Sequence, residues 1–260
     1  MKITYIILMT SLLCPVTWAK DHRYYFPSVD ELPVIEFLPD PFIMEDSSRV
    51  KTPEDWAKQR EYLKLMVQHY MYGFRPPVPD DVDVEVSGNG SNRTMKFTVN
   101  PPGGKSFSFD AGMFIPSGDG PFPVVIRNNR SPEPSQTEMA EERGYIMISY
   151  NRVQLDQDQG GPQANYNNRS PAQEAYPHYS WETIMCWSWG YSVIIDWLET
   201  QGYVNLDGIV VTGHSRGGKA ALIGGIMDER IALTVPNGSG AGGSGNWRFG
   251  DFGGAYKDEG

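Results

Sequence analysis

Apolar residues along the chain follow two spacings, one typical of β-strands and one typical of α-helices. Alternation with a period of two, or a short apolar run that ends in polar residues, predicts strands. The segments with this pattern are DVDVEVSG, TMKFTVN, SFSFDAGMFIPSG, PFPVVIRNN, YIMISYN, GIVVTG and IALTVPNGSG. Apolar residues three to four positions apart predict helices over 53–70, SQTEMAEERG, WETIMCWSWGYSVIIDWLETQG and RGGKAALIGGIMD, with Gly202 closing the third of them.

The order of these segments indicates the fold class. From residue 121 onward strands and helices alternate, which is typical of a largely parallel sheet with helices on both faces. The chain of 260 residues is long enough for one large domain and shows no break in composition. We therefore expect an α/β protein, a three-layer sandwich with a mostly parallel central sheet, over residues 20–260.

Two segments show no sustained spacing of apolar residues. Residues 20–48 are rich in Pro, Asp and aromatic residues, and we expect them to form an extended arm that lies over the domain. Residues 154–180 are rich in Gln, Asn, Asp, Gly and Pro. This second segment is expected to be a long loop, of the kind that tends to carry function.

The charge of the chain narrows the classes of partner. Its formal net charge is −10 at pH 7. Nucleic acid and anionic membrane surfaces are held by cationic patches, so we expect neither as a partner. A local basic pocket for a single carboxylate remains compatible with this charge.

The first nineteen residues, MKITYIILMTSLLCPVTWA, have the pattern of a secretory signal peptide. One Lys precedes an apolar run that is too short for a membrane span, and small residues stand at Thr17 and Ala19, which a signal peptidase reads. We expect cleavage after residue 19 and a secreted or periplasmic protein. Cys186 is then the only thiol, so the mature chain is expected to have no internal disulfide.

The segment Gly213-His214-Ser215-Arg216-Gly217 matches G-x-S-x-G between a predicted strand and a predicted helix. This context is typical of a nucleophilic serine at a strained turn, where only glycine on either side avoids clashes with the strand and the helix. The sequence therefore predicts Ser215 as a nucleophile. The alternative is a tight turn whose serine only caps the helix.

Two cations follow the predicted nucleophile. Arg216 is adjacent to it, and Lys219 comes one helical turn later. A helix N-terminus is already electropositive, so cations there are unfavourable unless an anion binds. We expect these two residues to stabilise an oxyanion or to face a substrate carboxylate. The alternative is a solvated helix face.

A serine nucleophile needs a base, and in α/β-hydrolases the order of the triad is Ser, acid, His. His22, His69 and His178 lie upstream of Ser215, and no His follows Ser215 in the sequence. His214 is expected to pack against the protein rather than to act as the base. His178 lies in the long loop and would serve only with an inverted order. The base is therefore missing from this chain.

Four blocks of the chain, in this order, are similar to one known family. They are LPDPFIMEDSSRVKTPEDWAKQREYLKLMVQHYMYGFRPP, WETIMCWSWGYSVIIDWLE, VTGHSRGGKAALIGGIMDERIAL and GSGAGGSGNWRFGD. The third block contains an S-R-x-G-K core that is specific among α/β-hydrolases. On these residues the chain resembles carbohydrate esterase family 15, the glucuronoyl esterases or 4-O-methyl-glucuronoyl methylesterases, and especially their bacterial branch.

The resemblance implies an α/β-hydrolase that cleaves the ester between a glucuronic acid branch on xylan and a lignin alcohol in plant cell walls. It implies Ser215 as the nucleophile, Arg216 as the residue that completes the oxyanion hole with its backbone N–H and guanidinium, and Lys219 as a ligand of sugar hydroxyls. The partner is then glucuronoxylan or a related carbohydrate ester. No metal ion or other cofactor is expected, and the full-length protein is expected to be a monomer.

Two features depart from the family pattern. Gly238 stands where many relatives have an acid before the Ser-Gly of the glycine-rich segment, which removes one candidate for the triad acid. The chain ends at Gly260, whereas relatives continue through roughly a further third that contains the His. We therefore expect a domain truncated at its C-terminus, with the catalytic acid and His beyond residue 260 and an inactive chain as one outcome.

Two other functions stay open at this point. One is an esterase for acetylated xylan or another small carbohydrate ester. The other is a non-catalytic relative that binds xylan oligomers without hydrolysing them.

Overall fold

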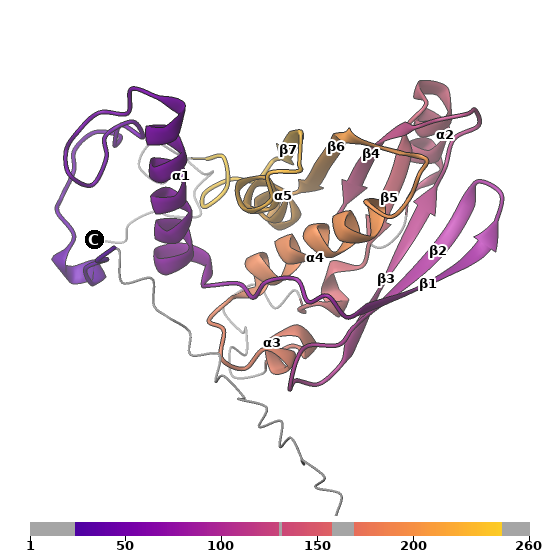
Figure 1. The fold of residues 1–260 in the computed structure, drawn as a ribbon, viewed down its shortest axis with the longest axis horizontal. Helices are drawn as coiled ribbons and strands as arrows, with labels where there is room; N and C mark the ends of the chain where they lie inside the picture. Colours follow the sequence, from indigo (N-terminus) through magenta and orange to yellow (C-terminus); the bar gives the residue numbers. More distant parts are fainter. Residues whose placement is uncertain (1–23, 130–131, 158–168, 246–260) are drawn as a thin grey trace, which may run out of the picture. The chain divides into compact units, whose positions relative to one another are not determined.

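The computed structural model describes residues 24–129, 132–157 and 169–245 (Figure 1). They divide into two compact units with a boundary after Asp40. Within 24–40 the described regular element is a short 3₁₀ helix, η1 (Val29–Glu31). Ser28 begins this helix and donates its backbone N–H to the Glu31 carboxylate at 2.9 Å. The predicted signal peptide lies outside the described residues.

The second unit is built on a seven-stranded sheet (Figure 1). Its strands are β1 (Val82–Asn89), β2 (Asn92–Val99), β3 (Phe107–Phe114), β4 (Phe122–Arg127), β5 (Ile146–Tyr150), β6 (Val204–His214) and β7 (Leu233–Asn237). Their order in space is β1-β2-β3-β5-β4-β6-β7. As predicted for the chain after residue 121, the strands β5, β4, β6 and β7 are parallel. The first three strands pair antiparallel with one another, and β3 pairs antiparallel with β5.

Helices cover both faces of this sheet, which confirms the predicted three layers. The α-helices are α1 (Pro53–Val67), α2 (Pro134–Arg143), α3 (Pro171–Ala175), α4 (Thr183–Leu198) and α5 (Arg216–Met227), and the π-helix η2 (Gln68–Tyr72) extends α1. Ala140 of α2 packs against Phe114 and Met147 on one face. Helices α4 and α5 pack on the other face, against the side chains of Val124 and Ile126 among others (Figure 1).

Helix α4 is the centre of the core because its apolar residues lie all around its circumference. Twelve of its sixteen residues are buried, among them Trp187, Trp189 and Tyr191. The helix ends at Leu198 and not at Gly202, because residues 199–201 form turns whose N–H groups donate to the last carbonyls of the helix. No helix among the described residues combines the length and apolar character that a membrane crossing needs.

The segments expected to be irregular contain short elements. Around residues 154–180 the structure has a 3₁₀ helix, η3 (Arg152–Gln154), and α3. Helix α3 begins at a capping box in which the Ser170 hydroxyl accepts the Gln173 N–H at 3.2 Å. The segment 20–48 contains η1, and its residue Ile43 forms an isolated antiparallel bridge with Arg49.

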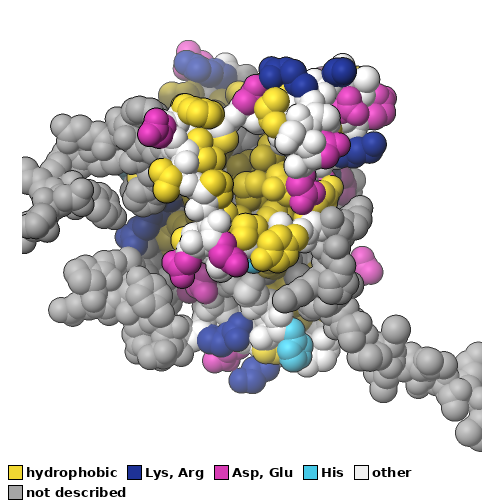
Figure 2. Space-filling model, turned by 90° about the vertical axis from the view of Figure 1, so that its left-hand side faces the viewer, with side chains coloured by type: hydrophobic (Ala, Val, Ile, Leu, Met, Phe, Trp, Pro, Cys, Tyr) yellow, Lys and Arg dark blue, Asp and Glu magenta, His cyan; other side chains and the backbone are white. Residues whose placement is uncertain are grey.

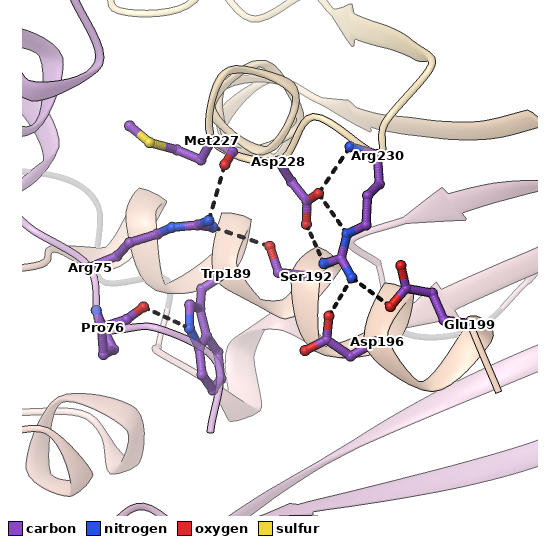
Figure 3. A network of polar contacts seen from close by, with 9 residues as sticks. All are labelled: Arg75, Pro76, Trp189, Ser192, Asp196, Glu199, Met227, Asp228 and Arg230. Carbon is purple, nitrogen blue, oxygen red and sulfur yellow. Dashed lines mark hydrogen bonds and ion pairs between the residues drawn. The ribbon is translucent and has the colours of Figure 1, made fainter. Parts of the chain in front are cut away.

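A half-buried arginine, Arg75, ties the segment after η2 to α4 and α5 (Figure 3). Arg75 donates to the Ser192 hydroxyl and to the Met227 carbonyl, each at 3.2 Å. Beside it, the indole of Trp189 donates to the Pro76 carbonyl at 3.1 Å. Burial lowers the pKa of Arg75. Arg75, Ser192 and Trp189 thus each have a hydrogen-bond partner at this junction (Figure 3), as polar groups shielded from water require.

A second arginine closes the C-terminal end of α5 (Figure 3). Arg230 contacts the carboxylates of Asp228 at 2.8 Å, Asp196 at 2.6 Å and Glu199 at 3.1 Å. Burial raises the pKa of Asp228, but hydrogen bonds from Arg230 and Ser192 outweigh it, so this pKa lies below its usual value. The cluster therefore joins α4 to the turn between α5 and β7.

The coverage of the sheet by α2 decreases toward β7. Met147, Val125, Val210 and Leu233 form one row across β5, β4, β6 and β7. Met147 is buried under α2, Val125 and Val210 are half-buried, and Leu233 is 56% exposed.

Another face, seen from the α1 side of the molecule, gathers hydrophobic side chains at its centre with acidic and basic side chains around them (Figure 2).

Candidate active site

Ser215 occupies a strained turn between β6 and α5. Its φ is 55° and its ψ is −121°, a combination that costs free energy for any residue with a Cβ. The serine side chain makes no capping hydrogen bond to the helix, so the alternative of a simple cap is wrong. The backbone is held on both sides, because the Ser215 N–H donates to the Asn237 carbonyl at 3.0 Å and its carbonyl accepts the Lys219 N–H at 3.1 Å.

The glycines around Ser215 are sterically required, as predicted. A Cβ on Gly213 would lie 2.3 Å from the Gly217 carbonyl oxygen, and one on Gly217 would lie 2.4 Å from Oδ1 of Asn128. A Cβ on Gly218 would lie 2.6 Å from the Asn237 carbonyl oxygen. These separations are far below van der Waals contact, so the turn closes only without side chains at these positions.

A pocket of about 280 Å³ opens beside Ser215 at the carboxyl ends of β4 and β6. The chain leaves β4 toward α2 on one face of the sheet and leaves β6 toward α5 on the other, and such divergence is where open α/β sheets bind ligands. The pocket is lined by Arg127, Asn128, Asn129, Arg152, Gly213, His214, Ser215 and Arg216. Among these residues are three arginines and no carboxylate, so the pocket is suited to negative charge.

Sequence reasoning missed four residues of this pocket, which are Arg127, Asn128, Asn129 and Arg152. Asn128 Nδ2 donates to the Gly217 carbonyl at 2.7 Å, and Arg152 Nη1 donates to the Asn128 carbonyl at 2.8 Å. The Arg152 guanidinium lies over the Trp187 ring, 4.5 Å from its centroid. A signal for Asn128 was present in the sequence, because it directly follows the apolar run VVI and Arg127 and therefore stands at the carboxyl end of a predicted central strand.

The structure brings together Ser215 and Arg216 but places Lys219 elsewhere. Arg216 is exposed and lines the pocket directly after the serine. Lys219 is not among the pocket-lining residues, and its Nζ donates to the Ser239 carbonyl in the segment after β7. Burial lowers the pKa of Lys219, and the charge of Arg216 lowers it further. The binding of sugar hydroxyls by Lys219 stays a prediction.

The glycine-rich segment that follows β7 folds around Ser239. The Ser239 hydroxyl pairs with the Ser244 hydroxyl at 2.8 Å and accepts the Ser244 N–H at 2.9 Å. Tyr72 of η2 donates its hydroxyl to the Gly242 carbonyl. Gly238 has a φ of 53°, and a Cβ on it would lie 3.1 Å from the imidazole of His214. Because residue 238 is a glycine, it supplies no carboxylate to this neighbourhood.

His214, which was expected to pack against the protein, has its imidazole beside Gly238 but is not buried. Its side chain is exposed, and its residue lines the pocket rim beside Ser215. His178 is exposed as well and is not among the residues that line this pocket. The described residues also form no cluster of His, Cys, Asp and Glu that could hold a metal ion.

The strained serine between glycines, above the carboxyl ends of parallel strands, has the backbone geometry expected of a nucleophile elbow, and the fold is that of the α/β-hydrolases. Residues 98–259 match the model of the fungal glucuronyl esterases. The chain belongs to the glucuronoyl esterase family, carbohydrate esterase family 15.

Relatives and solved structures of this family cover most of the chain. A 4-O-methyl-glucuronoyl methylesterase of Podospora anserina is 36% identical over 228 residues, which are 86% of this chain and 45% of the relative. A family 15 glucuronoyl esterase from Caldicellulosiruptor kristjansonii is 32% identical with a TM-score of 0.64, over 83% of this chain and 59% of that chain.

A mutant glucuronoyl esterase from Sporotrichum thermophile, solved in complex with methyl 4-O-methyl-beta-D-glucopyranuronate, is 33% identical with a TM-score of 0.62, over 79% of this chain and 53% of that chain. The chain thus spans about half the length of the relatives it matches.

Proposed function

We propose that this protein is a serine-type carboxylic ester hydrolase that cleaves glucuronoyl esters of plant cell-wall carbohydrate through an acyl-enzyme on Ser215. The observation that carries the proposal is the conformation of Ser215, a serine held at positive φ on the edge of a pocket lined by three arginines. A residue kept in a costly conformation at a ligand-binding position is typical of a functional site.

The proposed reaction has two steps, acylation of Ser215 and hydrolysis of the acyl-enzyme. The Ser215 Oγ attacks the ester carbonyl carbon and forms a tetrahedral oxyanion, which collapses with loss of the alcohol and leaves the uronoyl group on Oγ. Water then attacks the acyl-enzyme and releases the uronic acid. The backbone N–H of Arg216, at the start of α5, and its guanidinium stabilise the oxyanion in each step. A general base, which we expect to be a His, takes the proton of Ser215 and returns it to the departing alcohol.

The substrate class is supported by the charge of the pocket and by the relatives. The relative from Podospora anserina is named for 4-O-methyl-glucuronoyl esters, and the structure from Sporotrichum thermophile contains the methyl ester of such a sugar. One guanidinium nitrogen of Arg127 is buried without a hydrogen-bond acceptor in the described part of the chain. An oxyanion or a uronate carboxylate would supply such an acceptor. Lys219 would bind sugar hydroxyls once it leaves the Ser239 carbonyl.

The test compares wild-type protein, expressed from its complete gene, with Ser215→Ala on a glucuronic acid methyl ester and on acetylated xylan. We expect Ser215→Ala to lower kcat by at least about 10³-fold. The matched control is Ser87→Ala, at an exposed serine of β1 whose hydroxyl donates to the Thr94 carbonyl at 3.5 Å, and it should keep full activity.

Each result decides between the candidate functions. Preference for acetylated xylan would replace the glucuronoyl substrate with an acetyl ester. Binding of xylan oligomers without hydrolysis of either ester would show a glycan-binding protein and refute the esterase. We also propose secretion of a monomer after cleavage of residues 1–19, which N-terminal sequencing of the exported protein and its sedimentation would verify.

A further inference from the structure

We propose that Asn128 is a positioning residue for Ser215 and that Arg152 holds Asn128 in place. The inference rests on the proposed function, since it concerns the same nucleophile. Asn128 follows β4 directly, and only 1% of it is exposed to solvent. Neither Asn128 nor Arg152 belongs to the S-R-x-G-K core around Ser215.

The side chain of Asn128 fills the space between the two elements that Ser215 joins. Its Nδ2 donates to the Gly217 carbonyl in the first turn of α5 at 2.7 Å. Its Oδ1 lies 2.8 Å from the place that a Cβ on Gly213, near the end of β6, would occupy. The amide therefore touches the chain on both sides of the serine, and sets how far the start of α5 lies from the end of β6.

Such a contact matters because Ser215 is strained. Its φ of 55° persists only while the surroundings leave the backbone no relaxed alternative. The hydrogen bond of the Ser215 N–H to the Asn237 carbonyl constrains the elbow from β7. Asn128 supplies the matching constraint from β4, on the opposite side of β6 in the sheet.

Arg152 fixes which way the amide of Asn128 points. Its Nη1 donates to the Asn128 backbone carbonyl at 2.8 Å and lies 3.4 Å from Asn128 Oδ1. A donor on this side favours the orientation with Oδ1 toward Arg152 and Nδ2 toward Gly217. The guanidinium is itself held over Trp187 of α4, whose indole donates to the Asp156 carbonyl at 2.8 Å. The constraint on the elbow thus extends back to the core helix.

This role predicts an effect on kcat and not on KM, because the polar atoms of the Asn128 side chain are directed at the protein. Asn128→Asp keeps the shape and the acceptor toward Arg152 but removes the donor toward Gly217. We expect kcat for a glucuronic acid methyl ester to fall between about 10-fold and 100-fold, with KM within about threefold of wild type.

Two further variants complete the kinetic test. Asn205→Asp is the matched control at the opposite end of β6, where the side-chain oxygen accepts the Asp207 N–H at 3.1 Å and an aspartate keeps that acceptor. It should leave kcat within about twofold. Arg152→Met should lower kcat in the same direction as Asn128→Asp. The double variant should lose less than about twofold more than Asn128→Asp alone, since residues that act as one unit are not additive.

Hydrogen exchange gives a readout that needs no turnover. The N–H groups of Ser215 and Lys219 bond across the elbow, to the Asn237 and Ser215 carbonyls. In Asn128→Asp we expect exchange in residues 214–219 to become at least about fivefold faster, while exchange in α4 is unchanged.

The outcomes separate the two proposals. If the wild-type protein hydrolyses no ester, the proposed function fails, and the exchange rates alone decide on Asn128. The positioning role is overturned by unchanged kcat and exchange in Asn128→Asp, by a rise in KM at constant kcat, or by additive losses in the double variant with Arg152→Met.

Discussion

The steric role of Gly213 leads to a prediction whose size follows from one distance. In Gly213→Ala the new methyl group would lie 2.3 Å from the Gly217 carbonyl oxygen and 2.5 Å from its carbon. The carbonyl must move by about 0.7 Å to restore a separation of 3.0 Å, and both atoms belong to the backbone, so no side-chain rotation relieves the clash. Overpacking of this kind costs about 1–3 kcal/mol.

The same movement disturbs two other features of the site. The displaced carbonyl accepts the Asn128 Nδ2 at 2.7 Å, and weakening that bond adds about 1 kcal/mol. The total of about 2–4 kcal/mol corresponds to a fall in Tm of roughly 4–16 °C for a unit of this size. Because Ser215 lies between residues 213 and 217, we also expect activity to fall by about 100-fold.

Thermal melting and ester hydrolysis measure both effects on the same samples. Gly202→Ala is the matched control, since a Cβ there meets no atom within 4 Å, and its free energy of unfolding should stay within about 0.5 kcal/mol of wild type. A Gly213→Ala protein that melts within about 1 °C of wild type and keeps its activity would refute the steric account of the elbow.

Two further predictions concern the rest of the domain. Arg230→Met removes the cation that contacts Asp228, a residue that is 6% exposed. Urea unfolding at pH 7 should show that the free energy of unfolding falls by about 2 kcal/mol. This value is below that of a fully buried ion pair because Arg230 is one-third exposed. The pKa of Asp228 is lower in the folded than in the unfolded protein. The stabilisation is therefore complete above the unfolded-state pKa near 4 and disappears as pH falls through the folded-state pKa. If Arg230→Met lost as much stability at pH 2 as at pH 7, the ion pair with Asp228 would not be its cause. Leu233→Thr with Val235→Thr on β7 should raise the soluble fraction after centrifugation and change stability by less than about 0.5 kcal/mol, whereas a larger loss would show that these exposed side chains are packed.

Local signals in the sequence were enough to predict the elbow and its flanking elements. The glycines at 213 and 217, an apolar run before them and helical spacing after them specify β6, Ser215 and α5 without reference to distant residues. The parallel pairing of the strands after residue 121 was also predictable from local patterns. Strands and helices alternate in this part of the chain, and the connections between parallel strands require that order.

The contacts that complete the site could not be predicted in this way. The placement of β4 between β5 and β6 decides that Asn128 meets Gly217, and strand order is not encoded in any one segment. Lys219 appears beside Ser215 in the sequence, yet its long side chain turns to the Ser239 carbonyl after β7. The end of α4 at Leu198 also depended on hydrogen bonds in the following turns rather than on Gly202.

The backbone of Ser215 links the proposed reactivity of this residue to the stability of the domain. Ser215 and Ser47 are the two non-glycine residues at positive φ in the described part of the chain. Holding Ser215 there costs about 1–3 kcal/mol, out of a net stability of about 5–15 kcal/mol for a typical domain. We therefore expect substitutions far from the pocket that strengthen the core to help Ser215 keep its strained backbone, and those that weaken the core to relax Ser215 before they unfold the chain.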